Sequence, residues 1–298
     1  MISVLIPIYN YSVVDLVKEL HKQLKDCKIP FEIICLEDGS DDDFVKQNEV
    51  INEFSNTSLI VAESNNGRIK SRQILSEQAK YDWLLFLDSD VLPKHKDFIY
   101  EYLKFVNSKN ESVFGGICYN RKKPEKDFIL RWKYGISKEE VNAVTRNKNK
   151  YKNIVSANML IKKDLFNSIN SKIELEGYGL DNYFSALMKE MNTIPLHVDN
   201  EVIHLGIEKS DVYLKKIETA VLNLLKLYRD HKLINHENNL YAFFVVLKRF
   251  KLHYMFSAFY ASFKSLMKRN LLSEHPSISI LQLYKITLMC NTYFNKSI

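Results

Sequence analysis

The first two thirds of the chain alternate between short apolar runs and segments whose apolar residues recur at helical spacing. The apolar runs cover residues 3–8, 31–36, 58–62 and 83–87, and the clearest helical patterns cover residues 13–24 and 68–79. Neighbouring parallel strands need a long crossover between them, and a helix usually supplies it. The alternation therefore predicts an α/β fold with a Rossmann-like mixed, mostly parallel sheet and helices on both faces.

The pattern loosens after residue 110 and changes again near residue 206. Further strands are expected at residues 113–118 and 154–161, separated by a polar, Lys-rich stretch at 121–152 that is typical of a surface excursion covering a site. From residue 210 onward, apolar residues keep the helical spacing. We therefore expect a catalytic domain at residues 1–206 and a helical C-terminal region at residues 207–298.

Composition excludes several classes of protein. Lys and Arg exceed Asp and Glu by only 42 to 36, a net charge of +6 that does not indicate nucleic-acid binding. The 4 cysteines are scattered without a C-x-x-C pair, which argues against a zinc site or a disulfide framework. The first apolar run has no basic segment before it, and no uncharged apolar run reaches about 18 residues. These features predict a cytoplasmic protein without a signal peptide or a spanning helix.

Two carboxylates follow the apolar run at residues 83–87 directly, in the sequence Asp88-Ser89-Asp90. In open α/β sheets, ligands bind beyond the carboxyl ends of the strands. Carboxylate oxygens suit Mg²⁺ or Mn²⁺, and such an ion can neutralise the charge of a departing diphosphate. The alternative is a turn whose Asp residues only bind the local backbone. The spacing alone leaves both interpretations open.

Five other short motifs accompany this one in a fixed order. They are Ser3-Val4-Leu5-Ile6-Pro7-Ile8-Tyr9-Asn10, Glu37-Asp38-Gly39-Ser40, Asn66-Gly67-Arg68 with Ser71-Arg72-Gln73, Gly177-Tyr178-Gly179-Leu180-Asp181-Asn182, and Val198-Asp199-Asn200 through His204-Leu205-Gly206. Together they resemble the family 2 glycosyltransferases, from residue 2 to about residue 228. The resemblance implies a GT-A fold and inverting transfer of a sugar from a nucleoside-diphosphate sugar, here a UDP-sugar, to an acceptor hydroxyl in cell-surface glycan synthesis.

The resemblance also assigns a donor site. Its residues would be Pro7, Tyr9, Asn10, Glu37, Asp38, Arg68, Arg72, Asp88 and Ser89. Asp38, or less readily Glu37, would accept the uracil N–H, and a helix cap supplied by Asp38 or Ser40 is the alternative. Arg68 and Arg72 are four residues apart and therefore share a helix face. From there they would approach the base or the diphosphate.

A divalent cation, Mn²⁺ or Mg²⁺, is the implied cofactor. The resemblance makes Asp90 the first ligand, directs Asp88 toward the ribose or the metal, and gives His204 the role of an imidazole ligand. A lone histidine beside an apolar run is more often a structural hydrogen-bonding residue. For His204 the assignment therefore rests on its place in the resembled segment.

The acceptor site would contain Tyr178, Gly179 and Asn182. The family carries a Glu-Asp pair where this chain has Asp181-Asn182, and its second residue usually removes the proton from the acceptor. An amide has no such role at neutral pH. We expect Asp181 to act as the base, with Glu176 in reserve, while a helix cap at Asp181 is the structural alternative.

Two other functions remain open at this stage. One is a non-catalytic protein that binds sugar nucleotides or glycans, suggested by Asn182. The other is a sugar-1-phosphate nucleotidyltransferase, a class that usually carries a Gly-rich phosphate loop after its first strand. The sequence Pro7-Ile8-Tyr9-Asn10-Tyr11 offers no such loop, so this function ranks last.

Residues 238–275 combine many aromatic side chains with six cations. The cations are Lys248, Arg249, Lys251, Lys264, Lys268 and Arg269, against the single acid Glu274. Apolar surface flanked by cations is typical of helices that lie on an anionic bilayer. We expect peripheral contact with the inner face of the cytoplasmic membrane, where lipid-linked acceptors would be reached. Packing on the catalytic domain, or a homodimer seam, is the alternative.

Overall fold

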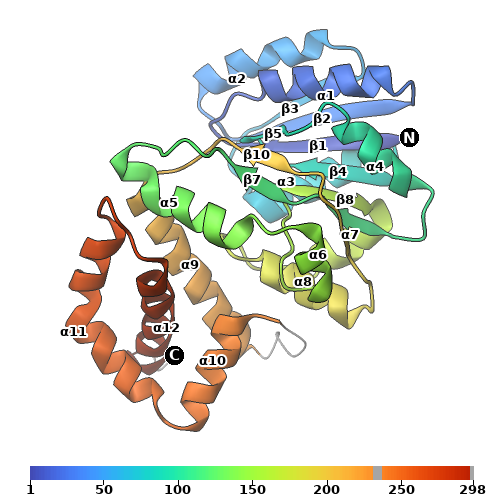
Figure 1. The fold of residues 1–298 in the computed structure, drawn as a ribbon. Helices are drawn as coiled ribbons and strands as arrows, with labels where there is room; N and C mark the ends of the chain where they lie inside the picture. The colour runs from blue at the N-terminus through green and yellow to red at the C-terminus, as the bar shows by residue number, and fades with distance from the viewer. Residues whose placement is uncertain (231–236, 296–298) are drawn as a thin grey trace. The chain divides into compact units, whose positions relative to one another are not determined.

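The computed structural model describes residues 1–230 and 237–295. Within these residues a seven-stranded sheet has the order β3 (Thr57–Ala62), β2 (Phe31–Asp38), β1 (Ile2–Ile8), β4 (Trp83–Leu87), β8 (Asn158–Lys162), β6 (Ser112–Phe114) and β9 (Leu196–His197). The strands β3, β2, β1 and β4 are parallel neighbours, whereas β8 runs antiparallel to both β4 and β6. The mixed, mostly parallel sheet predicted from the alternation is confirmed (Figure 1).

Strand order and chain direction determine which helices cover each face. From β1 the chain steps outward to β2 and β3 through α1 (Val14–Asp26) and α2 (Asp42–Asn48), then returns to β4 through α3 (Arg68–Gln78). Right-handed crossovers that reverse direction put their helices on opposite faces. Accordingly α1 contacts α4 (Phe98–Val106), while α3 contacts α7 (Lys163–Asn170). Both faces of β1 and β2 are therefore covered, and these strands are almost wholly buried.

A second, smaller sheet forms beside the end of β4. Its order is β5 (Val91–Pro93), β10 (Val202–His204) and β7 (Ile117–Tyr119). The strand β10 is antiparallel to β5, with His204 paired to Val91. This pairing brings a distant part of the sequence next to the residues that follow β4.

Two predicted strands differ from the structure. Residues 113–118 were expected to form one strand, but β6 and β7 divide at Gly115 and Gly116 and enter different sheets. The buried guanidinium of Arg146 donates to the carbonyl oxygens of Phe114 and Gly115 at 3.0 and 3.3 Å, and the same two oxygens accept the backbone N–H groups of Val198 and Asn200. Residues 154–161 were also expected to be a strand, yet β8 begins only at Asn158.

Contacts divide the chain into two compact units. The first contains residues 1–120, 140–176 and 187–206, including α6 (Ala143–Lys148), and the second contains residues 121–139, 177–186 and 207–298. The last boundary between the units lies at residue 206. Residues 121–139, expected as part of a surface excursion, form a short 3₁₀ turn (Lys126–Phe128), α5 (Ile129–Tyr134) and a π turn (Gly135–Glu139) within the second unit. The assignment of these units as functional domains stays a prediction.

The second unit is mainly helical. It contains α9 (Ser210–Arg229), α10 (Asn239–Arg249), α11 (His253–Leu271) and α12 (Ile278–Asn295), and α8 (Asp181–Glu190) begins in it. The long helices α11 and α12 pack against each other, and α12 also contacts α9 and α10. Within residues 1–230 and 237–295, none of the helices is long and apolar enough to cross a bilayer.

Candidate functional site

The carboxyl ends of β1, β2 and β4 meet at one edge of the parallel part of the sheet. Tyr9 and Asn10 follow β1, Asp38 ends β2, and Asp88 follows β4 directly. Most of the predicted donor residues therefore gather at this edge. It is also where ligands bind in open α/β sheets.

Asp88 is bound by both predicted arginines. Nη2 of Arg68 donates to Oδ2 of Asp88 at 2.8 Å and to Oδ1 at 3.1 Å, while Nη2 of Arg72 donates to Oδ1 at 2.7 Å. Burial opposes ionisation of this carboxyl, but the charges of Arg68, Arg72 and His204 together hold its pKa below the ordinary value. Asp88 is thus an anion that fixes two cations at the edge of the sheet. The predicted common face of Arg68 and Arg72 is confirmed.

The two arginines differ in exposure. The side chain of Arg72 is 6% exposed, against 36% for Arg68. Arg72 also donates to the carbonyl oxygen of Ser156 at 2.7 Å, so its guanidinium is held from two sides. Arg68 retains the accessible surface that a phosphate would need, whereas Arg72 acts mainly to hold Asp88 in place.

Ser156 belongs to the site and was not predicted from the sequence. Its hydroxyl lies 3.1 Å from Nη2 of Arg68, and its carbonyl oxygen binds Arg72. The next residue, Ala157, accepts the backbone N–H of Asp88 at 3.2 Å. These contacts follow from the antiparallel pairing of β8 with β4, in which Leu87 faces Asn158. The β8–β4 pairing would have identified Ser156 as a site residue, but this pairing cannot be inferred from the local sequence.

Asp90 and His204 form the second pair at this edge. Nε2 of His204 lies 3.4 Å from Oδ2 of Asp90, and the His204 ring stacks on Tyr119 with centroids 5.4 Å apart. The backbone N–H of Leu205 donates to the carbonyl oxygen of Asp90 at 2.8 Å, which extends the β5–β10 pairing around the pair. Both side chains are thus oriented by the small second sheet.

A glycine completes this arrangement. A Cβ atom added to Gly206 would lie 2.3 Å from Oδ2 of Asp90 and 2.6 Å from its Cβ, so only glycine leaves the carboxylate in its position. On the other side, burial and then the negative charge of Asp90 raise the pKa of Tyr11. Gly206, Tyr11 and Tyr119 support the Asp90–His204 pair and were not among the predicted site residues.

The chemistry of the pair suits a divalent cation. A carboxylate oxygen and an imidazole nitrogen are both acceptable to Mn²⁺, and Mg²⁺ sites commonly use one or two protein carboxylates plus substrate phosphates. Among residues 1–230 and 237–295, no group of three His, Cys, Asp or Glu side chains is placed to hold a metal ion. The pair therefore fits a cation that takes its remaining ligands from a bound diphosphate. Asp88, predicted to face the ribose or the metal, binds the two arginines.

Glu37 links the turns that follow β1 and β2. Its fully buried carboxylate accepts hydrogen bonds from Nδ2 of Asn48 at 2.5 Å and from the hydroxyl of Ser40. The Ser40 hydroxyl in turn accepts the backbone N–H of Asn10 at 2.9 Å. Oδ1 of Asn10 accepts the N–H of Asp41 at 2.8 Å. This hydrogen-bonded network holds the loop that would contact the donor base.

Asp38 binds the loop that begins α3. Its carboxylate accepts the backbone N–H groups of Asn66 at 2.8 Å and Gly67 at 3.0 Å, together with Nδ2 of Asn66 at 3.0 Å. Helix α2 begins after Asp41 without a side-chain cap, so neither Asp38 nor Ser40 supplies the cap considered as the alternative. Asp38 instead positions the N-terminus of α3, directly before Arg68.

The remaining predicted donor residues differ in exposure. Pro7 and Ser89 are half-buried, whereas Tyr9 is 56% exposed and presents its ring to solvent. An exposed aromatic ring at the carboxyl end of β1 is suited to stacking on a nucleotide base. Contact of these three residues with a donor stays a prediction.

The predicted acceptor residues belong to the second unit. Tyr178 is half-buried, its carbonyl oxygen accepts a hydrogen bond from Nδ2 of Asn223 at 3.2 Å, and burial raises the pKa of its phenol. Gly179 has a φ of +91°, and a Cβ there would lie 2.7 Å from the Cβ of Ala220 on α9. Helix α8 begins at Asp181, which places Asp181 and Asn182 in its first turn. Their roles in catalysis and acceptor binding stay predictions.

Solved structures share this fold. The mannosyltransferase PcManGT from Pyrobaculum calidifontis, in complex with GDP-Man and Mn²⁺, has 14% identity and a TM-score of 0.58, with 99% of this chain and 86% of that chain covered. Glucosyl-3-phosphoglycerate synthase from Mycobacterium tuberculosis, in complex with Mn²⁺, UDP and glucosyl-3-phosphoglycerate, has 15% identity and a TM-score of 0.52, with 76% and 79% covered. For S. aureus TarS 1-349 the identity is 20%, the TM-score 0.44, and the coverage 75% of this chain and 65% of that chain.

The likenesses to PcManGT and to glucosyl-3-phosphoglycerate synthase identify the architecture as the GT-A fold. No curated protein sequence matches the chain significantly. The sequence profile described as "Glycosyl transferase family 2" matches residues 3–169, more than half of the 298 residues. The matched segment includes α3 with its arginine pair, and β4 followed by Asp88 and Asp90. The chain therefore belongs to glycosyl transferase family 2.

Proposed function

We propose that this glycosyltransferase moves a sugar from a UDP-sugar to an acceptor hydroxyl, with inversion at the anomeric carbon. The observation that carries the proposal is the gathering of Arg68, Asp88, Asp90 and His204 at one edge of the sheet, where Asp90 and His204 lie 3.4 Å apart. Positive charge from Arg68, and from a metal ion held by Asp90 and His204, would stabilise the negative charge of the leaving diphosphate. The acceptor we propose is a lipid-linked glycan, within cell-surface glycan synthesis on the inner face of the cytoplasmic membrane.

Donor binding would use the surfaces that the first unit leaves accessible. The exposed ring of Tyr9 would stack on the base, and Arg68 would donate to the diphosphate. Asp88 partly neutralises both arginines, so an incoming phosphate would share Arg68 with an anion already in place. Arg72 would keep Asp88 fixed while Arg68 turns toward the donor.

Asp90 and His204 would hold Mn²⁺ or Mg²⁺, with the other ligands supplied by the donor. When bound, the cation neutralises negative charge on the departing nucleoside diphosphate. Solved structures of the same fold contain Mn²⁺ with GDP-Man or with UDP. Both nucleotides therefore belong in a donor screen.

Asp181 would take the proton from the acceptor hydroxyl, and Tyr178, Gly179 and Asn182 would bind the acceptor. Asp181 lies in the first turn of α8. Asn182 has no proton-accepting atom for this step. The variant Asp181→Asn should reduce kcat about 100-fold or more with little change in donor KM. If Asn182→Asp instead converts an inactive protein into an active one, the chain is a degenerate binding protein.

The decisive experiment measures UDP and GDP release from a panel of nucleotide sugars, with Mn²⁺ and then with EDTA. Asp90→Asn removes the proposed metal-binding carboxylate charge without changing side-chain size. Asp82→Asn is the matched control, because Asp82 is exposed and precedes the opposite end of the same strand. We expect release that requires metal, is lost in Asp90→Asn and survives in Asp82→Asn. Full activity in Asp90→Asn, or in EDTA, would refute the metal-binding role.

A further inference from the structure

Helix α10 carries more apolar surface than its packing uses. Phe244 and Leu247 face inward and are buried. On other parts of the helix surface, Phe243 is 47% exposed, Val246 47%, and Phe250, directly after the last turn, 65%. The three exposed residues follow one another at spacings of three and four, which places them along one face.

Helix α11 repeats this arrangement over a greater length. Its buried side chains, including Tyr260, Met267 and Leu271, face the neighbouring helices. The exposed apolar residues on a different side are Met255, Phe259, Phe263 and Leu266, with exposures of 60, 36, 42 and 52%. Their spacing of four, four and three residues forms one continuous stripe.

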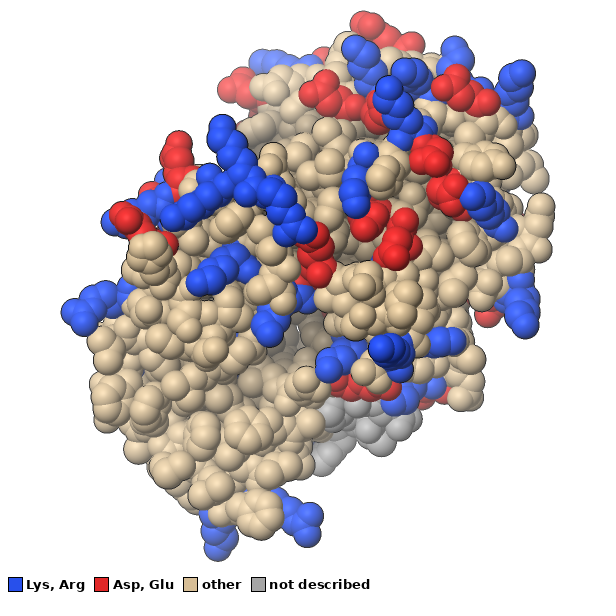
Figure 2. Space-filling view, viewed as in Figure 1, with Lys and Arg blue, Asp and Glu red and all other residues tan. Residues whose placement is uncertain are grey.

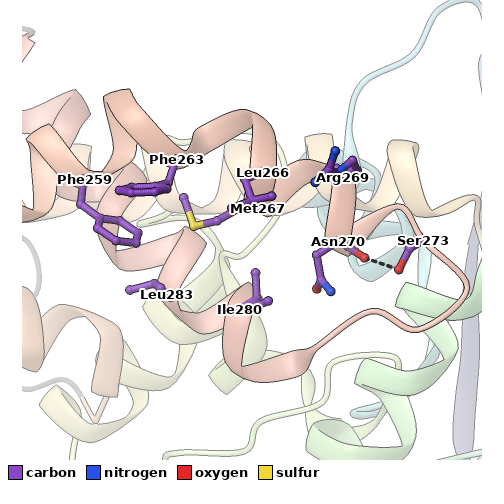
Figure 3. A pocket seen from close by; sticks show the side chains of 9 residues that line it. All are labelled: Phe259, Phe263, Leu266, Met267, Arg269, Asn270, Ser273, Ile280 and Leu283. Atoms are coloured by element: carbon purple, nitrogen blue, oxygen red, sulfur yellow. Dashed lines mark hydrogen bonds between the residues drawn. The ribbon is translucent and has the colours of Figure 1, made fainter.

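The α10 stripe contacts α11 through Phe243. The ring centroids of Phe243 on α10 and Phe256 on α11 are 6.1 Å apart in an edge-to-face contact. At the other end of α11, an open groove of about 490 Å³ lies between α11 and α12. Figure 3 shows Phe259, Phe263 and Leu266 beside Ile280 and Leu283 at this groove. We call Phe243, Val246, Phe250, Met255, Phe259, Phe263 and Leu266 the α10–α11 surface.

Cations outnumber anions around the α10–α11 surface, where Glu274 follows directly and Glu218 pairs with Lys268. The sequence from residue 238 to residue 273 contains six Lys and Arg residues and neither Asp nor Glu. Arg249, Lys251, Lys264 and Arg269 are exposed, and Arg269 lines the groove. In Figure 2 the region of these helices is broadly tan, with Lys and Arg side chains at its lower end. An occupant of this surface should be apolar and should carry negative charge.

A second copy of the chain meets only the first requirement. In a two-fold interface each patch faces itself, so the cations around one copy would face the cations around the other. Like charges brought together in this way oppose association. An anionic bilayer satisfies both requirements, because aromatic and aliphatic side chains enter the acyl boundary while Lys and Arg contact the headgroups.

We propose that the α10–α11 surface is a peripheral binding site for anionic phospholipid membranes. The apolar residues enter the interface, and the flanking cations provide attraction that depends on salt concentration. The proposal does not depend on the reaction catalysed, since none of the residues that carry it belongs to the proposed donor, metal or acceptor site.

The test is sedimentation of the full chain with vesicles of phosphatidylcholine, with and without phosphatidylglycerol. We expect strong binding only when phosphatidylglycerol is present, and release in about 0.5 M NaCl. The variant Phe250→Ser/Phe259→Ser/Phe263→Ser should weaken binding at least about 10-fold. The variant Arg249→Glu/Lys251→Glu should weaken it about 30-fold or more. All these side chains are exposed, so the fold should be retained, which circular dichroism checks.

Matched variants elsewhere on the molecule serve as controls. Tyr100→Ser/Val144→Ser removes apolar side chains that are 58 and 69% exposed, and Lys22→Glu/Lys46→Glu reverses two exposed charges. Both should bind vesicles like the unmodified chain. Absence of binding to anionic vesicles, or equal losses in test and control variants, would overturn the proposal. So would a dimer in sedimentation velocity that the serine variant dissociates, because a second copy would then be the occupant. Sedimentation does not involve sugar transfer, so this result is separable from a failure of the proposed function.

Discussion

His204 Nε2 lies 3.4 Å from Oδ2 of Asp90, although the two residues come from distant parts of the sequence. The antiparallel pairing of β10 with β5 produces this proximity, since it sets His204 opposite Val91, the residue after Asp90. The first unit thus uses a small additional sheet to bring an imidazole to the end of β4. Its main sheet supplies only the carboxylate.

Removal of the imidazole should weaken metal binding selectively. In His204→Ala, we expect the Mn²⁺ concentration for half-maximal nucleotide release to rise at least about 10-fold, because one of two protein ligands is lost. Activity at saturating Mn²⁺ should recover in part. His95→Ala is the control, since His95 is exposed in the same unit. An unchanged Mn²⁺ requirement would exclude His204 as a ligand.

Gly206→Ala should disturb Asp90 without a change in any ligand. The added methyl group would lie 2.3 Å from the carboxylate oxygen, so the Asp90 side chain must rotate away. We expect kcat/KM for the donor to fall about 100-fold, as misplacement of a catalytic group by about 1 Å can do. Leu205→Ala, at a neighbouring side chain that is 44% exposed, should remain active. Equal activity in the two variants would contradict the tight packing of Gly206 on Asp90.

Substitution of Arg72 should mainly lower stability, whereas substitution of Arg68 should mainly weaken donor binding. Arg72→Leu removes one of the two guanidinium partners of the partly buried Asp88 carboxylate. It should lower the free energy of unfolding by roughly 2–4 kcal/mol. Arg68→Ala should cost less than about 1 kcal/mol, because its side chain is 36% exposed, yet raise the donor KM about 10-fold. Urea unfolding and donor titration measure the two effects. A larger rise in donor KM for Arg72→Leu than for Arg68→Ala would show that Arg72, not Arg68, faces the donor.

The free energy of unfolding should decrease as the pH falls, because of His197. Its Nδ1 accepts a hydrogen bond from Nη1 of Arg146 at 3.2 Å, and its Nε2 donates to the carbonyl oxygen of Lys150 at 2.7 Å, an arrangement that needs the neutral ring. Burial, with the positive charges of Arg146 and Lys150, lowers the pKa of His197 to about 4.

The sign of the effect follows from this lowered pKa. Between the unfolded value near 6.5 and the folded value of about 4, only the unfolded chain binds the proton. The contribution of His197 to stability is therefore complete above about pH 6.5 and falls by about 2.5 kcal/mol at pH 4.5. Urea unfolding at both pH values should show a smaller loss in His197→Gln than in the unmodified chain. The control His95→Gln should show the full loss, and parallel curves for all three proteins would exclude His197 as the cause.

The parallel half of the fold could be predicted because each element is determined by its local sequence. The strands β1, β2 and β4 are apolar runs buried on both faces, β3 is a partly exposed edge strand, and the strand-to-helix alternation fixes their connections. The edge that collects Asp38, Arg68 and Asp88 follows from that order. Their mutual contacts are long-range in sequence but result from regular geometry.

The antiparallel half could not be predicted in the same way. The division of residues 113–118 coincides with the contacts of buried Arg146 to the carbonyl oxygens of Phe114 and Gly115, and β8 begins after Ser156 and Ala157, whose carbonyl oxygens bind Arg72 and Asp88. These contacts join segments without any local periodicity. A pattern based on neighbouring residues therefore contains no information about them.

Asp38 has a structural role that its sequence motif does not suggest. Its carboxylate secures the start of α3, and Arg68 is the first residue of that helix. A change of nucleotide preference engineered at position 38 would therefore also shift the arginine that we propose for the diphosphate. In the donor site that we propose, base selection and leaving-group stabilisation would evolve together, because Asp38 would contact the base and also holds the start of the helix that carries Arg68.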